Sequence, residues 1–211
     1  PTETEQERNM KRFYGGEVDG ESRQLARYVH KTTKIYMPEM NPMMIYRLDR
    51  FRRGGHHKPF NDLGFTGIRI MEAHENYNRQ HQDIRTENGI EYGDVIEYVN
   101  FAYTKKLTAV NAISMANLAW APPAPTNVKI GGIVEPSVKL AWEHSNKSDV
   151  KGYKIYWRKT TSPTWDHFKY VENTNEFTLD GIIIDNYYFG IAAVGENGHE
   201  SVVVFPSGIL R

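Results

Sequence analysis

Cysteine is absent from all 211 residues of the chain. Its absence excludes disulfide bonds, thiolate metal ligands and a cysteine nucleophile, so any zinc site must be built from His, Asp or Glu. No apolar run approaches the roughly 20 residues that a membrane-spanning helix needs. No charge of one sign prevails either, because 26 basic residues balance 26 acidic residues. A general basic field that attracts nucleic acid or an anionic membrane is therefore excluded as the basis of function.

The start of the chain also lacks the features of a secretion signal. Its first nine residues, PTETEQERN, carry neither a basic segment nor an apolar core, and the first residue is proline rather than methionine. These features predict that the sequence is a processed or truncated part of a longer protein.

A proline-rich stretch marks the clearest boundary in the sequence. The three prolines of LAWAPPAPTNVKI cannot continue a helix and favour an extended connection. Helical spacing of apolar residues precedes this stretch, and short alternating runs follow it. We therefore predict an N-terminal domain over residues 1–120, a linker over 121–126 and a second domain over 127–211.

Alternating apolar and polar residues fill the C-terminal part. VKLAW, YKIYW and YYFGI follow this pattern, and turn-rich stretches such as SNKSD and GENGHES separate the runs. The pattern predicts an antiparallel sandwich of roughly seven strands. Residues 123–207 resemble a fibronectin type III domain in the Pro-rich start, in Trp142, in GYKIYW and in YYFGIAAVGENGHES, where Tyr187 matches the family's tyrosine-corner residue. The resemblance implies a spacer or a binding platform and does not indicate an activity.

Helical spacing alternates with short apolar runs in the N-terminal part, which predicts an α/β fold. Two strands make a thin sheet that is marginally stable by itself. Its apolar faces therefore require a partner, which is a second copy, a cleaved N-terminal half of the same domain, or a neighbour in contact with the long helix. The predicted elements are a helix over residues 20–37, a strand over 42–49, a short helix over 58–64 that ends at Gly64, a strand over 66–72 and a long helix over 92–120 capped by Asp94.

Four of the chain's eight histidines lie close together in the sequence, as His56, His57, His74 and His81. If the two predicted strands are parallel, the first pair follows the first strand, whereas the second pair and Asp83 follow the second strand. Ligands bind at the carboxyl ends of strands in α/β sheets, so this placement favours a site. No HExxH or comparably specific motif is present. Metal ligands, hydrogen-bonded structural histidines and surface positions are all compatible with the spacing.

The same stretch resembles the C-terminal part of the secreted zinc aminopeptidases, whose superfamily includes bacterial leucyl aminopeptidases and glutaminyl cyclases. The resemblance covers roughly residues 1–119 and is carried by YRLDRFRRGGHHKPFNDLGFTGIRIMEAHENYNRQHQDIRTENGIEYGD. Family members often have an acidic residue and a histidine ahead of Pro-Phe, then a strand, a loop with a zinc-binding histidine and a long closing helix. GGHHKPF matches the first of these with His57, and NRQHQD matches the loop with His81.

The resemblance implies that His81 is a zinc ligand and that His57 lies near the metal or serves the structure without binding it. Asp83 either orients His81 and its loop or is a solvated turn residue. His56 departs from the family pattern, because an acidic residue usually stands there. The family's other ligands, which include a His-x-Asp and a Glu-Glu pair, precede anything in this chain. The substitute acids within the chain, none in such a setting, are Asp49, Glu72, Glu75 and Asp83.

By resemblance, the parent protein hydrolyses N-terminal peptide bonds with two zinc ions, which activate a water and polarise the scissile carbonyl. A carboxylate then transfers the proton of that water to the leaving amine. These 211 residues are expected to be inactive alone, and the parent to be extracellular or periplasmic. The alternative is a non-catalytic interaction protein with a degenerate peptidase scaffold and a binding sandwich. His56 favours the alternative, whereas an intact His-x-Asp and Glu-Glu in the parent would favour the enzyme.

Overall fold

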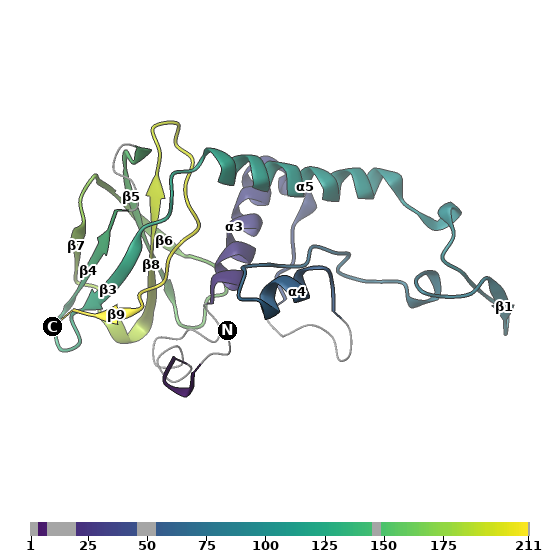
Figure 1. Ribbon diagram of the computed structural model, residues 1–211, viewed down its shortest axis with the longest axis horizontal. Helices are drawn as coiled ribbons and strands as arrows, with labels where there is room; N and C mark the ends of the chain where they lie inside the picture. Colours follow the sequence, from purple (N-terminus) through teal and green to yellow (C-terminus); the bar gives the residue numbers. More distant parts are fainter. Residues whose placement is uncertain (1–3, 8–19, 46–53, 145–148, 211) are drawn as a thin grey trace.

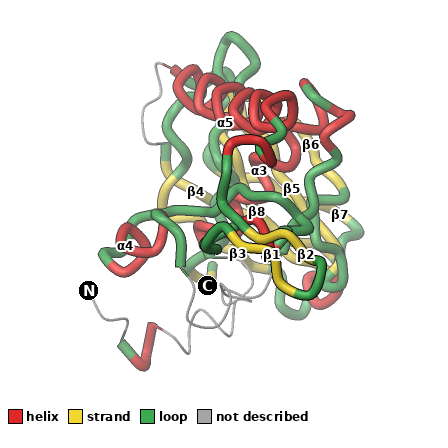
Figure 2. Tube along the Cα trace, turned by 90° about the vertical axis from the view of Figure 1, so that its right-hand side faces the viewer, coloured by secondary structure: helices red, strands yellow, loops and turns green. Residues whose placement is uncertain are grey.

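A computed structural model describes residues 4–7, 20–45, 54–144 and 149–210 of the chain (Figure 1). A β-sandwich lies at one end of the molecule, and α5 runs from its edge toward the opposite end, where a hairpin projects. Figure 2 views the molecule from the end that carries this hairpin. No helix within these ranges is long and apolar enough to cross a membrane.

The helices and strands follow one another along the chain as two helical segments, a hairpin, a long helix and the sandwich. They are α3 (Glu21–Tyr36), η1 (Pro38–Met40), α4 (His57–Asp62), η2 (Tyr77–Arg79), β1 (Arg85–Glu87), β2 (Ile90–Tyr92), η3 (Ile96–Tyr98), α5 (Phe101–Trp120), β3 (Thr126–Gly131), β4 (Ser137–Glu143), β5 (Gly152–Lys159), β6 (His167–Glu172), β7 (Glu176–Asp180), η5 (Ile184–Asn186), β8 (Tyr187–Val194) and β9 (Gly208–Ile209).

Two sheets form the sandwich, with strand orders β7-β4-β3-β9 and β6-β5-β8. All neighbours are antiparallel except β3 and β9, which are parallel. Their facing side chains make the core, because alternate residues of a strand point to the same side of its sheet. Leu140 on β4, Ile155 on β5 and Ile191 on β8 are completely buried in it. The predicted sandwich is confirmed.

Strand β5 is buried on both faces, as is the neighbouring β8. Tyr153 and Ile155 face the core, whereas Tyr156 and Arg158, at positions of the opposite parity, are both 3% exposed. Helix α3 contacts this outer side through Lys31, whose ammonium donates to the Tyr156 hydroxyl at 2.6 Å. The outer face of this sheet is therefore covered partly by its own domain, through contacts such as that of the Tyr156 and Trp165 rings, and partly by Lys31 of the N-terminal part.

Both predicted early helices form, but the long helix begins later than the sequence predicted. The structure starts α5 at Phe101, where the Asn100 Oδ1 accepts the Tyr103 N–H at 3.0 Å. Asp94 is therefore not the cap. Val95 and Val99 have extended backbones on either side of η3, and Asn100 is itself a favoured N-cap residue.

The predicted α/β sheet is not seen among the described residues. Residues 66–72 contain no strand, and neither do 42–45, while the rest of the first predicted strand lies outside the described ranges. Instead, the sheet of the N-terminal part is the hairpin β1–β2, with Asn88 and Gly89 at its turn. Both have positive φ, 54° and 77°, as a two-residue type I′ turn requires. Each predicted strand had only the other as a partner, and such a pair is marginal.

Helices α3 and α5 contact each other, but they bury little apolar surface. In the described part before residue 121, Val110 is the one apolar residue counted as buried. The other buried side chains are polar, namely Gln24, Arg27, Thr32, Thr33 and Ser114. This part consequently lacks an apolar core of its own within the described ranges.

Candidate functional site around His81

His81 lies in the loop between η2 and β1, and backbone hydrogen bonds close this loop at its base. The Gly93 N–H donates to the Asn78 carbonyl at 3.0 Å, and the Asp94 N–H donates to the Gln82 carbonyl at 3.3 Å. These bonds join the segment that enters the hairpin to the segment that leaves it. The loop and the hairpin therefore form one unit that fixes the position of the His81 backbone.

The backbone of His81 is in the left-handed region, with φ of 55°. This conformation costs most L residues about 1–2 kcal/mol. Among the described residues, the other non-glycine positions with positive φ are all asparagines, namely Asn41, Asn88 and Asn127. Strained residues of this kind persist where the surroundings fix them, often at functional sites. The geometry thus singles out His81 within its loop.

Three residues from different segments brace the base of the loop. The Arg79 guanidinium lies 3.4 Å from the centroid of the Tyr98 ring. The Tyr98 hydroxyl donates to Glu91 at 2.6 Å, and Arg79 lies 3.6 Å from the same carboxylate. The hydrogen bond from Tyr98, followed by the charge of Arg79, lowers the pKa of Glu91. Sequence reasoning missed this cluster, because Tyr98 was assigned to the long helix.

The other predicted site residues that the structure describes do not form a metal centre with His81. His57 is the first residue of α4 and is half-buried, whereas His56, His74 and Asp83 are exposed, like His81. The described residues contain no group of three or more His, Asp or Glu side chains that could hold a metal ion.

The candidate acids are no better placed than the histidines. Glu75 lies 3.5 Å from the Arg69 guanidinium, and its side chain is only 12% exposed. Glu72 is exposed, and Asp49 lies outside the described residues. Within the described part of the chain, neither Glu72 nor Glu75 completes a ligand set with His81.

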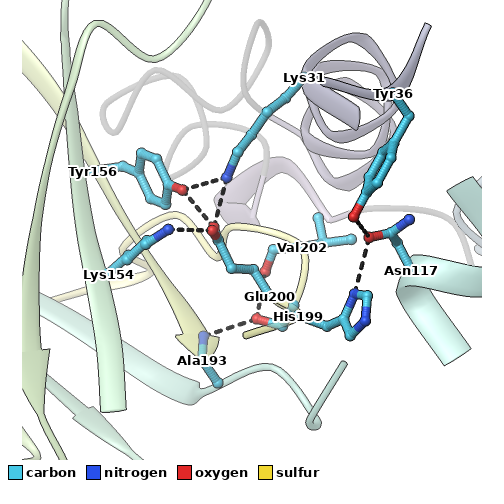
Figure 3. A network of polar contacts seen from close by, with 10 residues as sticks. Lys31, Tyr36, Asn117, Lys154, Tyr156, Ala193, His199, Glu200 and Val202 are labelled. Carbon is cyan, nitrogen blue, oxygen red and sulfur yellow. Dashed lines mark hydrogen bonds and ion pairs between the residues drawn. The ribbon is translucent and has the colours of Figure 1, made fainter. Parts of the chain in front are cut away.

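A second polar centre joins α3 to the sandwich (Figure 3). The Lys31 ammonium donates to the Tyr156 hydroxyl at 2.6 Å and to Glu200 Oε2 at 2.7 Å. Lys154 and the Tyr156 hydroxyl also donate to the Glu200 carboxylate, whose side chain is 12% exposed. The carboxylate thus receives hydrogen bonds from both parts of the molecule.

The protonation equilibria of this centre reflect its burial and its charges. Burial by itself would raise the pKa of Glu200, but the charge of Lys31 and the hydrogen bonds from Lys154, Lys31 and Tyr156 hold it below its usual range. Burial, followed by the negative charge of Glu200, raises the pKa of Tyr28 to about 12. At neutral pH the centre therefore holds a carboxylate between cationic and neutral donors.

Helix α5 is tied to the sandwich close to the proline-rich stretch. The His199 Nδ1 lies 2.9 Å from the Asn117 Oδ1, so this nitrogen is the donor. The Asn197 side chain donates to the Trp120 carbonyl at 3.1 Å, and the Trp120 and His199 rings lie 5.2 Å apart. The C-terminal end of α5 is therefore in contact with the sandwich.

Residues 123–206 match the sequence model of the family described as "Fibronectin type III domain". This part of the chain is a fibronectin type III domain. Among solved structures, the fibronectin type III domain of human contactin 1 is 20% identical to this chain, with a TM-score of 0.33, and the match covers 40% of this chain and 76% of that one.

Longer proteins resemble the fibronectin type III domain together with the N-terminal part. The chain is 44% identical over 193 residues to a protein of Pyrenophora teres f. teres named "Probable zinc metalloprotease", a match that covers 91% of this chain and 40% of the relative. A second protein of that description, from Leptosphaeria maculans, is 42% identical over 91% of this chain and 44% of its own length. The chain therefore spans less than half the length of these relatives.

Proposed function

We propose that this chain is part of a zinc-dependent peptidase and that His81 is one ligand of its metal centre. The observation that carries the proposal is the similarity to proteins named probable zinc metalloproteases, which covers 91% of the chain. A match that long must reach well beyond the fibronectin type III domain. It therefore includes the loop that carries His81.

The geometry of the loop supports His81 as the ligand. Its imidazole is exposed, and its backbone is held in a costly conformation by a braced loop. Zinc accepts imidazole nitrogen readily, and catalytic zinc sites use three protein ligands. The described residues supply no such set, so they do not make a zinc site by themselves. The remaining ligands belong, in this proposal, to polypeptide that the longer relatives contain.

The finer proposal is an aminopeptidase that uses two zinc ions. Its support is the order of the motifs, with GGHHKPF followed by the His81 loop and a long helix. Held by His81 and a complete ligand set, such ions would supply activation of a water and polarisation of the scissile carbonyl. The described residues do not supply that set, and in this proposal the general base also lies in the rest of the longer protein, so we expect these 211 residues to be inactive alone. An extracellular or periplasmic location belongs to the same proposal.

A non-catalytic interaction protein is the second candidate. His56, in place of the expected acidic residue, favours it. The hydrogen bonds from Lys31 of α3 to Tyr156 of β5 and to Glu200 limit it, since part of that face of the fibronectin type III domain is already in contact with the same chain.

Calorimetric zinc titration tests the proposal on this chain and on a chain extended to the length of the relatives. We expect the extended chain to bind about two zinc ions and His81→Ala to weaken binding at least about ten-fold. His74→Ala is the matched control, because His74 is an exposed histidine that precedes the same loop. It should leave binding unchanged. An extended chain that binds no zinc, or that responds equally to both substitutions, would contradict the proposal.

Hydrolysis assays separate the two candidate functions. The aminopeptidase proposal expects the extended chain to cleave a peptide with a free amino terminus and to leave its N-acetylated counterpart intact. Cleavage of both peptides would support a peptidase of another type. Zinc binding without cleavage of either would favour the interaction protein.

A further inference from the structure

A projecting segment of the N-terminal part exposes an unusual share of its apolar side chains. We call residues 84–101, from the end of the His81 loop to the first residue of α5, the apolar arm. It lies at the end of the molecule opposite the sandwich (Figure 1). Its exposed large apolar residues, with Ile84 at 78%, Ile96 at 67% and Phe101 at 63%, are Ile84, Ile90, Ile96, Tyr98, Val99 and Phe101.

The apolar arm cannot stabilise itself through its own packing. Strands β1 and β2 have three residues each, and nearly all of them are exposed. A two-stranded hairpin of this kind is marginal in water without a third strand or a covering layer. Its internal bracing by Arg79, Tyr98 and Glu91 is polar and leaves the aliphatic side chains in solvent. Clustered exposure of this kind marks an interaction site.

We propose that the apolar arm is the docking surface for the part of the peptidase polypeptide that the longer relatives contain and this chain does not. The match to the Pyrenophora relative covers 40% of that protein, so more than half of its length is available to cover the arm. The identity of the occupant rests on the proposed function, whereas the existence of the surface rests on the exposed side chains.

Charge gives the chemistry of the occupant and argues against a second copy. The arm contains four acidic residues and a single basic one, which are Arg85, Glu87, Glu91, Asp94 and Glu97. Arg85 pairs with Glu87 and Arg79 pairs with Glu91, so the net negative charge of the arm comes from Asp94 and Glu97. Two copies that meet through the same face would bring like charges together around the apolar contact. The occupant therefore presents an apolar surface edged by basic groups.

Docking of the arm gives a role to the His81 loop. His81 precedes the arm by three residues, and the Asp94 N–H on the arm donates to the carbonyl of Gln82, the residue next to it. Because of this hydrogen bond, covering the arm would also restrict the backbone that carries the His81 imidazole. The arm is thus a positioning element for the candidate ligand.

Single cysteines test the docking surface, because the chain has no cysteine of its own. Ile96→Cys and Phe101→Cys place a thiol on the arm, and Val134→Cys places one at a 96% exposed position of the sandwich as the matched control. The rate of reaction with a soluble maleimide is measured on this chain and on the chain extended to the length of the relatives. We expect the arm thiols to react at least about ten-fold more slowly in the extended chain, with Val134→Cys unchanged.

Equal rates for the arm thiols in the short and the extended chain would overturn the proposal. Slow reaction already in the short chain, relieved by dilution, would also overturn it, because a second copy would then cover the arm. The assay is run in chelator and again with zinc. Protected arm thiols in an extended chain that binds no zinc would support the docking surface and contradict the proposed peptidase. Zinc binding that depends on His81, together with reactive arm thiols, would support the proposed zinc site and contradict the docking surface.

Discussion

The fibronectin type III domain and the N-terminal part place their large apolar side chains in opposite environments. All but one of the buried apolar residues among the described ranges lie in the fibronectin type III domain, with Val110 as the exception. Most of the exposed large apolar residues lie before residue 121. The domain thus contains the burial that stabilises it. The N-terminal part exposes surface that resembles half of an interior.

The two parts nevertheless meet through a polar rather than an apolar contact. Lys31 and Glu200 are separated by 169 positions in the sequence and lie 2.7 Å apart. Polar contacts of this type fix geometry more than they add stability. The domain therefore serves as a fixed support for α3 and α5, while the opposite end of the N-terminal part remains exposed.

The largest expected effect concerns the core of the sandwich. Leu140→Ala should lower the free energy of unfolding by about 2–5 kcal/mol, because it leaves a cavity among completely buried neighbours. Ile96→Ala on the apolar arm should change it by less than about 0.5 kcal/mol in this chain. Urea unfolding followed by tryptophan fluorescence measures both. Similar losses for the two variants would break the comparison.

The contact between the two parts should respond less strongly. Glu200→Gln removes the charge that Lys31 and Lys154 share, and should lower the free energy of unfolding by about 1–3 kcal/mol. Glu176→Gln is the matched control, since Glu176 pairs with Lys139 at 2.8 Å on the open surface. It should cost less than about 1 kcal/mol. Equal costs would mean that the contact between the parts adds nothing specific.

Acid should weaken the same contact in a defined direction. The folded protein holds the pKa of Glu200 below its ordinary value of 4.5. The stability from this carboxylate is therefore fully present above pH 4.5 and is lost as the pH falls through the lower, folded-state pKa. The difference in unfolding free energy between the unsubstituted chain and Glu200→Gln should become smaller over that range. A difference that is constant or grows toward acid would contradict this assignment.

The smallest effect is expected from substituting two glycines that both have a positive φ. Gly89 in the hairpin and Gly181 in the sandwich have φ of 77° and 74°, and neither has an atom near an added Cβ. Gly181→Ala should cost about 1 kcal/mol of global stability, because its turn belongs to the cooperative domain. Gly89→Ala should leave global stability unchanged and only increase amide exchange in β1 and β2. A global loss from Gly89→Ala would show that the hairpin folds with the rest.

The local sequence pattern was sufficient to predict the fold where each helix or strand packs against elements of the same domain. VKLAW and YKIYW revealed the sandwich because their alternate residues face a core within the same domain. The helix that became α3 was equally readable. The described residues show no α/β sheet, and a sheet of the two predicted strands would have had no third strand to support it. The Asn88-Gly89 turn was legible as a hairpin signal and was overlooked.

Contacts between distant segments could not be read from the sequence. Nothing local links Lys31 to Glu200, or Arg79 to Tyr98. One signal was present in β5, where Tyr156 and Arg158 follow the outward positions of a strand and carry large side chains. Such residues indicate a strand covered on both faces. The family pattern was sufficient to propose His81 as a ligand, whereas its left-handed backbone conformation could be seen only in the structure.

Hydrogen exchange of this chain alone tests the central contrast most directly. Amides of β4, β5 and β8 should exchange through global unfolding only, whereas amides of the apolar arm, residues 84–101, should exchange through local opening, much faster than those strands but more slowly than in an unfolded peptide. That result would support a fibronectin type III domain that is stable by itself and an N-terminal part that needs further polypeptide to become stable. Equal protection of the arm and the sandwich would contradict the account.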